Sequence, residues 1–176
     1  KMYGPKGVGA LYVKKGVEIE PILHGGGHEL GLRSGTENVP GIVGFAKAVE
    51  LSLKRMNKES NRLLRLRDKL IDGVLEIEDS RLNGHPKKRL PNNANFSFAG
   101  IKGNLLQDLD VKGILASSGS ACSSHSSKPS HVLTAIGLSE EGANASLRLT
   151  LGKDNTEEDI EYVLRILPGV IRELRR

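Results

Sequence analysis

Aromatic residues are scarce in this chain: they make up 3% of its 176 residues, and tryptophan is absent. Proteins that hold single-stranded nucleic acid stack its bases on aromatic side chains. The net charge is +5, but the lysines and arginines behind it are scattered among acidic residues instead of being gathered in one patch. We therefore expect no nucleic acid among the partners of this protein.

Long apolar runs are missing as well. No stretch approaches the roughly 18 apolar residues that a membrane-spanning helix needs, and none has the pattern of a signal peptide. The single cysteine cannot form an internal disulfide bond, which fits a reducing compartment. With 38% hydrophobic and 27% charged residues, the composition is typical of a soluble globular protein. We expect a cytoplasmic protein without a membrane partner.

The single cysteine, Cys122, lies in a stretch of small residues, Ser117-Ser118-Gly119-Ser120-Ala121-Cys122-Ser123-Ser124. A cysteine that serves packing usually has apolar neighbours, whereas serine and glycine on both sides are typical of an exposed loop. A buried structural cysteine is the alternative. The stretch favours a reactive thiol, and Cys122 is our first candidate for a catalytic residue.

A second candidate stretch runs from His24 to Asn38 and begins with three consecutive glycines. Glycines let main-chain N–H groups approach a ligand closely, and Arg33, Ser34 and Thr36 add a guanidinium and two hydroxyls. This combination suits a phosphate group, although glycine-rich stretches of this kind are often plain loops.

Two histidines of the same stretch have the spacing of metal ligands on one helix face. They are His24 and His28, and the glycines between them oppose a helix there. No further histidine, cysteine or glutamate follows at a suitable spacing. We therefore predict no metal site.

The first half of the chain reads as two short strands followed by helix. Residues 8–13 are apolar and predict a buried strand after a Gly/Pro turn, and residues 16–23 alternate weakly as a second strand. From 39 to 78 apolar residues recur every three or four positions, which predicts two long helices or one bent helix, with Pro40 in a first turn. The lysines and arginines along 62–69 are expected to form a solvated face.

The second half alternates strands and helices in a compact α/β pattern. Strands are predicted at 95–98, 114–117 and 145–151, and helices at 104–109, at 129–137 and after a Thr156 N-cap. The strand at 114–117 runs directly into the stretch that holds Cys122. Ligand-binding groups of α/β proteins commonly follow strand ends in this way.

Arg148 stands in the middle of an otherwise apolar strand, with Leu147, Leu149 and Leu151 on the other face. Burying a guanidinium without an anionic partner is costly, and a carboxylate would pair with it in a bidentate manner. An arginine on the solvated face of an edge strand is the alternative. Arg148 is thus a candidate for binding a carboxylate.

Four segments together resemble the NifS-like cysteine desulfurases, which depend on pyridoxal phosphate and form part of the class V aminotransferase superfamily. Lys1-Met2-Tyr3-Gly4-Pro5-Lys6-Gly7 is similar to the family's segment around the lysine that binds the cofactor. The stretch from Gly25 to Asn38 is similar to its glycine-rich and Arg-Ser-Gly-Thr segment. The remaining two are the cysteine loop with Pro129-Ser130-His131-Val132-Leu133, and the closing segment from Leu147 to Asp159.

The resemblance implies a role for four residues of this chain. Lys1 would bind pyridoxal 5'-phosphate through its amine, and Cys122 would take the sulfur of L-cysteine as a persulfide, leaving L-alanine. Arg148 would hold the substrate carboxylate, and Thr36 would bind the cofactor phosphate of the other subunit in a homodimer. The family hands its sulfur to an acceptor or scaffold protein for iron–sulfur cluster assembly or other sulfur compounds.

The resemblance also implies the fold class: α/β, the C-terminal part of a pyridoxal-phosphate-dependent transferase fold. Residues 1–81 would be the end of the large cofactor-binding domain, with its long helices, and 82–176 the small C-terminal α/β domain with the cysteine loop. The family segments before the lysine, which supply much of the cofactor site, have no counterpart here. Two other functions stay open: a truncated, catalytically silent module for interaction or structure, and a selenocysteine lyase.

Overall fold

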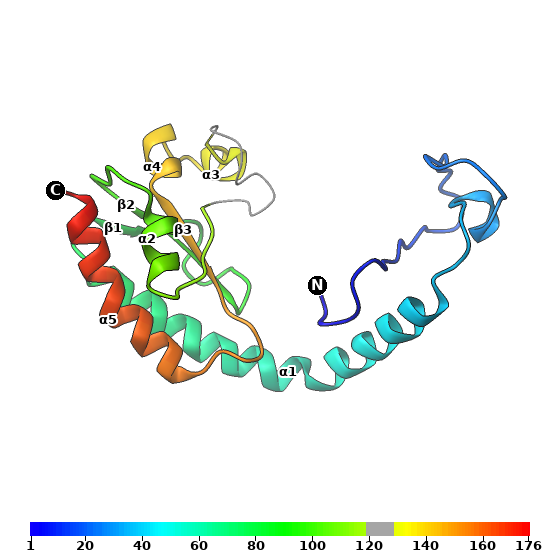
Figure 1. Cartoon of the computed structure of the whole chain (residues 1–176), viewed down its shortest axis with the longest axis horizontal. Coiled ribbons are helices and arrows are strands. Elements are labelled where there is room, and N and C mark those ends of the chain that lie inside the picture. The colour runs from blue at the N-terminus through cyan, green and yellow to red at the C-terminus, as the bar shows by residue number, and fades with distance from the viewer. Residues whose placement is uncertain (119–128) are drawn as a thin grey trace. The chain divides into compact units, whose positions relative to one another are not determined.

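The structure is a computed structural model that describes residues 1–118 and 129–176 (Figure 1). The chain divides into two compact units, Lys1–Asn57 and Lys58–Arg176. This division concerns packing within the chain, and the domain boundary expected at residues 81 and 82 stays a prediction. Among the described residues, no helix combines the length and the apolar character needed to cross a membrane.

The first unit contains little regular structure before its helix. A short 3-10 helix, η1 (Glu29–Gly31), follows the three glycines. The strands predicted at 8–13 and 16–23 are wrong, since both segments lie outside the strands that the structure describes. A strand needs a neighbour to bond its N–H and C=O groups, and no described segment pairs with these two.

One long helix, α1 (Val39–Leu75), replaces the alternative of two helices. Pro40 lies in its first turn, as expected from its fixed φ and missing N–H. Asn38 precedes the helix and accepts a hydrogen bond from the Gly41 N–H at 3.1 Å, so it satisfies one of the free donors of the first turn. The predicted helical stretch is therefore confirmed as one continuous helix (Figure 1).

The second unit is built on an antiparallel sheet in the order β1-β2-β3. Its strands are β1 (Ser80–Leu82), β2 (Asn93–Phe98) and β3 (Ser146–Thr150), so the strands predicted at 95–98 and 145–151 are confirmed. The strand predicted at 114–117 is reduced to one bridge, in which Ser117 pairs with Arg148 of β3. Residues 114–116 lie outside the described strands because this pairing begins only at Ser117.

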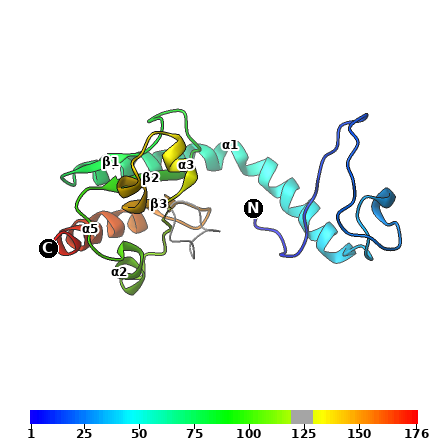
Figure 2. The same cartoon turned by 90° about the horizontal axis from the view of Figure 1, so that it is seen from above.

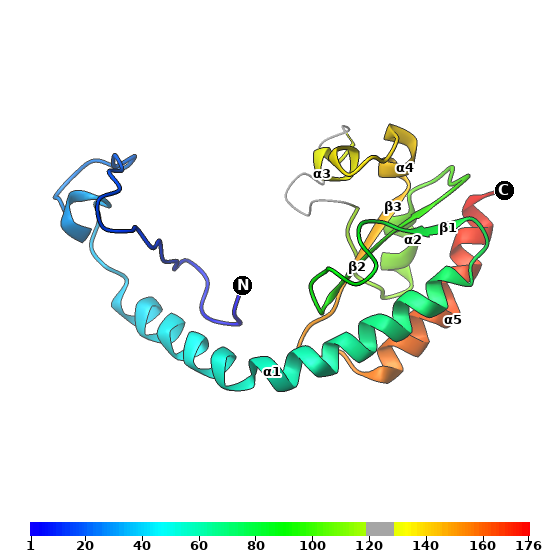
Figure 3. The ribbon, with the colours of Figure 1, turned by 180° about the vertical axis from the view of Figure 1, so that it is seen from behind.

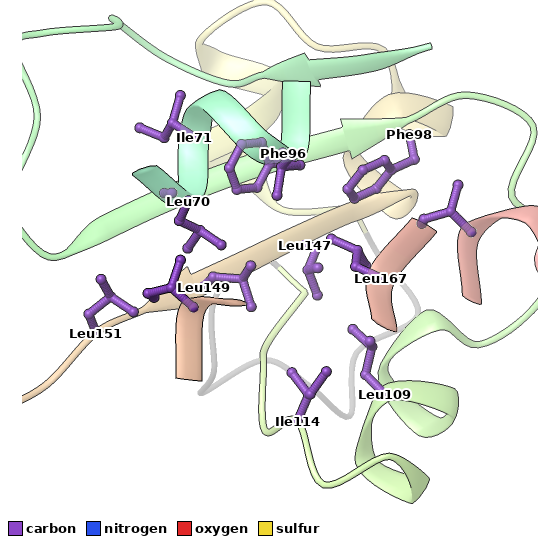
Figure 4. Close-up of a cluster of buried hydrophobic side chains, with 14 of the residues drawn as sticks. Leu70, Ile71, Phe96, Phe98, Leu109, Ile114, Leu147, Leu149, Leu151 and Leu167 are labelled. Atoms are coloured by element: carbon purple, nitrogen blue, oxygen red, sulfur yellow. The ribbon is translucent and has the colours of Figure 1, made fainter. Parts of the chain in front are cut away.

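Helices α1 and α5 (Glu157–Leu174) run side by side beneath the sheet (Figures 2 and 3). Alternation along β2 and β3 sends one set of side chains toward these helices and the other set to the opposite face. Figure 4 shows the apolar set meeting residues of both helices. The fully buried side chains of this core include Leu70, Phe96, Phe98, Leu109, Leu147, Ile160, Leu167 and Ile171.

The start of α5 follows its sequence prediction closely. Thr156 caps the helix by accepting from the Asp159 N–H, and the Asp159 carboxylate accepts from the Thr156 N–H, which forms a capping box. Hydrogen bonds from its own backbone N–H and from the Thr156 hydroxyl hold the pKa of Glu158 below its usual value. A negative charge is thereby kept at the helix N-terminus, where it is favourable.

Three short helices complete the second unit. α2 (Leu105–Val111) is capped by Asn104 and packs against α5, which confirms the helix predicted at 104–109. α3 (His131–Ala135) confirms the helix predicted after Pro129. α4 (Glu140–Asn144) lies on the sheet face opposite α1 and α5, where the Ser97 hydroxyl donates to the Gly142 carbonyl at 2.9 Å (Figures 1 and 3).

The crossing of α1 and α5 depends on a glycine, and this gives a test of the packing. A methyl group on Gly73 would lie 2.6 Å from Cδ2 and 2.7 Å from Cδ1 of Leu164, whereas one on Gly169 of α5 would meet no atom within 4 Å. We expect Gly73→Ala to lower the free energy of unfolding by about 1 kcal/mol, because overpacking outweighs the helix propensity of alanine.

Gly169→Ala is the matched control for this prediction. It places the same methyl group in a helix but in open space, so we expect it to raise the free energy of unfolding by about 0.5–1 kcal/mol. Urea denaturation of the two variants measures both values. Equal effects of the two substitutions would contradict the close crossing at Gly73.

Candidate active site

Arg148 lies in the middle of β3, and its neighbours on the two sides of the strand are held differently. On one side it is in register with Asn95 of β2. On the other side its N–H donates to the Ser117 carbonyl at 2.6 Å and its carbonyl accepts from the Ser117 N–H at 3.2 Å. The backbone of Arg148 is therefore fixed, and its side chain projects from the polar face of the sheet.

The guanidinium of Arg148 has no partner in the part of the chain that the structure describes. Its Nε is buried and makes no hydrogen bond, and the whole side chain forms no hydrogen bond or ion pair with any residue that the structure describes. A buried donor without a partner costs on the order of 1–3 kcal/mol, and more when the group is charged. The geometry supplies a cation with an unused donor, which suits an anionic ligand.

Arg148 belongs to a row of polar residues that crosses the sheet. Asn83 follows β1 and donates its N–H to the Asn95 carbonyl at 2.8 Å, so the row runs from Asn83 through Asn95 and Arg148 to Ser117. Residues directly opposite one another in antiparallel strands share a face. On the polar face of the sheet Arg148 is thus the direct neighbour of Ser117, and Cys122 follows Ser117 in the sequence.

The side chain of Asn83 connects those of Asn95 and Ser97 on this face. Its Nδ2 donates to the Asn95 Oδ1 and to the Ser97 Oγ, both at 2.7 Å. The Ser97 hydroxyl in turn donates a hydrogen bond to the Gly142 carbonyl. Asn83 is only 4% exposed, and its Oδ1 is buried without a partner among the described residues. The network holds the Asn95 side chain in one orientation.

The sequence did not single out Asn83 and Asn95. Alternation in β2 does indicate that Asn95 faces away from the buried Phe96 and Phe98. The register that sets it opposite Arg148 depends on pairing between two segments that are about 50 residues apart in the sequence. Such a pairing leaves no local signal in the sequence.

Lys1 and Thr36 belong to the first unit, and Arg148 to the second. The side chains of Lys1 and Thr36 are exposed, and neither forms a hydrogen bond or an ion pair within residues 1–118 and 129–176. Thr36 therefore has its hydroxyl available, and Lys1 its amine. The predicted roles of Lys1 and Thr36 stay predictions.

The segment that follows Lys1 is held on α1 by close contacts with small residues. A methyl group on Gly44 would lie 2.9 Å from Cγ of Pro5, and one on Gly4 would lie 3.0 Å from Cβ of Ala48. These glycines let the two backbones approach each other. They hold the chain against the helix from Gly4 onward, three residues after Lys1.

The glycine-rich stretch before Thr36 is organised by His28. The imidazole Nδ1 accepts from the Gly35 N–H at 3.3 Å, and a methyl group on Gly26 would lie 3.0 Å from Cε1 of the same ring. Gly35 itself has φ +113°, a conformation that side chains rarely adopt. The stretch thus forms a turn that presents Thr36, and its donor set of guanidinium, hydroxyls and amides suits a phosphate.

Cys122 lies outside the described residues, which end at Ser118 on one side and resume at 129 on the other. Its predicted role is therefore a prediction from the sequence. The part of the chain that the structure describes contains no group of three or more His, Cys, Asp and Glu side chains that could hold a metal ion.

The profile of one family matches almost the whole chain. Aminotransferase class-V is matched by residues 1–163. The chain belongs to the class-V aminotransferase family. A curated member of this family from Archaeoglobus fulgidus, cysteine desulfurase IscS 1, is 59% identical over 175 residues, which are 99% of this chain and 46% of that protein. The class-V chain described here therefore spans about half the length of the curated relatives that it matches.

Solved structures agree with this membership. A NifS-like protein superposes with a TM-score of 0.85 at 38% identity, over 98% of this chain and 44% of that one. A protein described as SspA in complex with cysteine superposes with a TM-score of 0.59 at 36% identity, over 85% of this chain and 41% of that one. The expected fold class, an α/β part of a transferase of this class, is confirmed, and so is the resemblance to the NifS-like class.

Proposed function

We propose that this class-V chain is part of a pyridoxal-phosphate-dependent cysteine desulfurase, which converts L-cysteine to L-alanine and carries the sulfur on Cys122. The observation that carries the proposal is the guanidinium of Arg148, which has no partner among the described residues and whose strand pairs with Ser117, five residues before Cys122 in the sequence. A carboxylate anchor next to a nucleophile is what an enzyme for a small thiol amino acid needs. The name of the Archaeoglobus relative supports the same reaction.

Arg148 binds the carboxylate of L-cysteine in this proposal. A guanidinium with a free, buried Nε can pair with a carboxylate through two parallel hydrogen bonds. Burial strengthens this pairing because water competes less for the donors. The bound amino acid is thereby oriented, with its thiol at a defined distance from the guanidinium of Arg148.

Cys122 takes up the sulfur. Its thiolate attacks the substrate sulfur, a new S–S bond forms, the substrate C–S bond breaks, and a proton takes the place of sulfur on the carbon to give L-alanine. A thiolate is the side chain that can accept sulfur in this way. The persulfide on Cys122 then passes its outer sulfur to an acceptor or scaffold protein, for iron–sulfur cluster assembly or another sulfur compound.

The residues of the first unit fit the cofactor. Lys1 offers an exposed amine for covalent attachment, and Thr36 offers a free hydroxyl at the end of a glycine turn held by His28, which suits the phosphate of the second subunit in a homodimer. The cofactor, when bound, supplies an electron sink for the carbon from which sulfur departs. An enzyme of this kind in the reducing cytoplasm keeps Cys122 as a free thiol.

Attachment of the cofactor to Lys1 tests the proposal. We expect the protein to develop the visible absorbance band of bound pyridoxal phosphate, and borohydride to fix the cofactor on the Nζ of Lys1, because this amine is exposed and has no partner among the described residues. Peptide fragmentation by mass spectrometry separates Nζ from the α-amine of the same residue.

Lys6→Arg is the matched control, since Lys6 is an exposed lysine of the same segment and its removal leaves Lys1 in place. We expect Lys6→Arg to keep the label and Lys1→Arg to lose the label on the side chain. Absence of any fixed cofactor would favour the silent module over the enzyme. Rates measured on L-cysteine and L-selenocysteine separate the desulfurase from the selenocysteine lyase.

A further inference from the structure

We infer that Asn95 is a second binding residue for the substrate carboxylate and acts together with Arg148. The inference rests on the proposed function of Arg148 and extends it to a neighbouring strand. Asn95 is half-buried on the polar face of β2, in register with Arg148 of β3. Directly opposite residues of antiparallel strands have Cβ atoms about 5 Å apart, so both side chains reach the same small ligand.

The hydrogen-bond network fixes which end of the Asn95 amide faces the ligand. The Ser97 hydroxyl has one hydrogen and gives it to the Gly142 carbonyl, so toward Asn83 it can only accept. Asn83 must therefore present its NH₂ group, which also donates to Asn95. The Asn95 oxygen consequently points at Asn83, and its NH₂ group points away from it.

This NH₂ group is unused. Asn95 donates no side-chain hydrogen bond to any residue in the described parts of the chain, although its oxygen is held at 2.7 Å by Asn83. The hydrogen bond from Asn83 therefore fixes the direction of the Asn95 NH₂ group but leaves this group without an acceptor among the described residues. A donor that is fixed in advance binds an anion with less loss of side-chain freedom than a mobile one.

The depth of the unpaired Arg148 nitrogen matches a short side chain. Nε is the guanidinium nitrogen nearest to the backbone, and it is the buried atom without a partner. A carboxylate that accepts from Nε lies closer to the sheet than one that accepts only from the two terminal nitrogens, and the short side chain of Asn95 stands on the neighbouring strand. A carboxylate oxygen that accepts from Arg148 has a second lone pair, which can accept from the Asn95 NH₂ group.

Binding of L-alanine, the unreactive product that carries the same carboxylate, tests the inference. In the ¹⁵N-labelled full chain we expect L-alanine to shift the resonances of the Arg148 Nε–H and the Asn95 side-chain amide. Asn95→Asp keeps an oxygen for Asn83 but replaces the donor by a negative oxygen, and we expect it to weaken L-alanine binding about tenfold or more. A hydrogen bond to a charged group has a value of this size.

Asn93→Ala is the control variant, because Asn93 lies two residues away on the same face of β2 and pairs with Thr150 instead. Ethylamine, which lacks the carboxylate, is the control ligand, and its weak binding should not respond to Asn95→Asp. Thermal melting of each variant reports on folding separately. A structural role of Asn95 would affect both ligands alike.

The outcomes separate this inference from the proposed function. Loss of L-alanine binding in Arg148→Ala but not in Asn95→Asp would overturn the role of Asn95 and leave that of Arg148 intact. Wild-type binding of L-alanine by both variants, or no shift at Arg148 in the wild-type protein, would overturn the carboxylate site as a whole. A matching effect of Asn93→Ala would also overturn the role of Asn95.

Discussion

Replacing Cys122 by serine is expected to abolish transfer of sulfur from L-cysteine to the protein. A serine hydroxyl is not ionised near neutral pH, and its oxygen cannot store a sulfur atom as a persulfide does. The effect should be complete within detection, because the sequence contains no second cysteine to take over. Cys122→Ala should behave in the same way.

The measurement is the mass of the protein after incubation with pyridoxal phosphate and L-cysteine, with L-alanine release followed in the same sample. The wild-type protein should gain one sulfur atom on the peptide that contains Cys122. Ser123→Ala is the control, since it alters the adjacent residue and leaves the thiol in place. Undiminished release of L-alanine by Cys122→Ser would overturn the assignment of the nucleophile.

The helices and two strands of the second unit could be predicted because their signals are local. The capping pattern at Thr156 and the alternation through Leu147 and Leu149 require only neighbours in sequence. The strands expected at 8–13 and 16–23 could not be judged in this way. An apolar extended segment becomes a strand only if another segment bonds to it, and pairing is not written in the segment itself.

The candidate site shows the same limit. Arg148 could be predicted as a site residue because burying a guanidinium in an apolar strand costs free energy unless an anion pairs with it. Asn95 carries no such signal, since an asparagine on the polar face of a strand is ordinary. Asn95 becomes a candidate only through two features of the fold. It is in register with Arg148, and three hydrogen bonds through Asn83 and Ser97 fix the orientation of its amide.

Register also explains why the site gathers where it does. Ser117 pairs with Arg148 through two main-chain hydrogen bonds, so the end of one segment is held beside β3. The residues after it contain the cysteine in the sequence. The sheet therefore joins the strand of Arg148 to the residue that precedes the cysteine's segment through backbone bonds, which hold position better than side chains do.

Arg148→Ala is expected to weaken binding of L-cysteine and L-alanine by roughly 2 to 4 kcal/mol, the range for loss of one partner of a hydrogen-bonded charge pair. This corresponds to a rise in the dissociation constant of about 30-fold to several hundred-fold. Arg148→Lys keeps the charge but loses the planar fork, so it should recover only part of the affinity. Isothermal titration with L-alanine measures these values.

Arg81→Ala is the matched control, since Arg81 lies on β1 in register with Ser97 on the same sheet face and is exposed. It should leave the affinity for L-alanine unchanged. An effect as large as that of Arg148→Ala would mean that the general positive charge of the face, and not one side chain, attracts the ligand.

The stability of Arg148→Ala distinguishes a binding role of this residue from a structural one. The buried Nε of Arg148 has no partner in residues 1–118 and 129–176, so within this part of the chain the residue contributes a desolvation cost without a compensating bond. Arg148→Ala should therefore leave the free energy of unfolding unchanged or raise it, while it removes binding. A group that serves function at the expense of stability shows this combination. A loss of stability of more than about 1 kcal/mol in urea denaturation would instead assign Arg148 to the structure of the sheet.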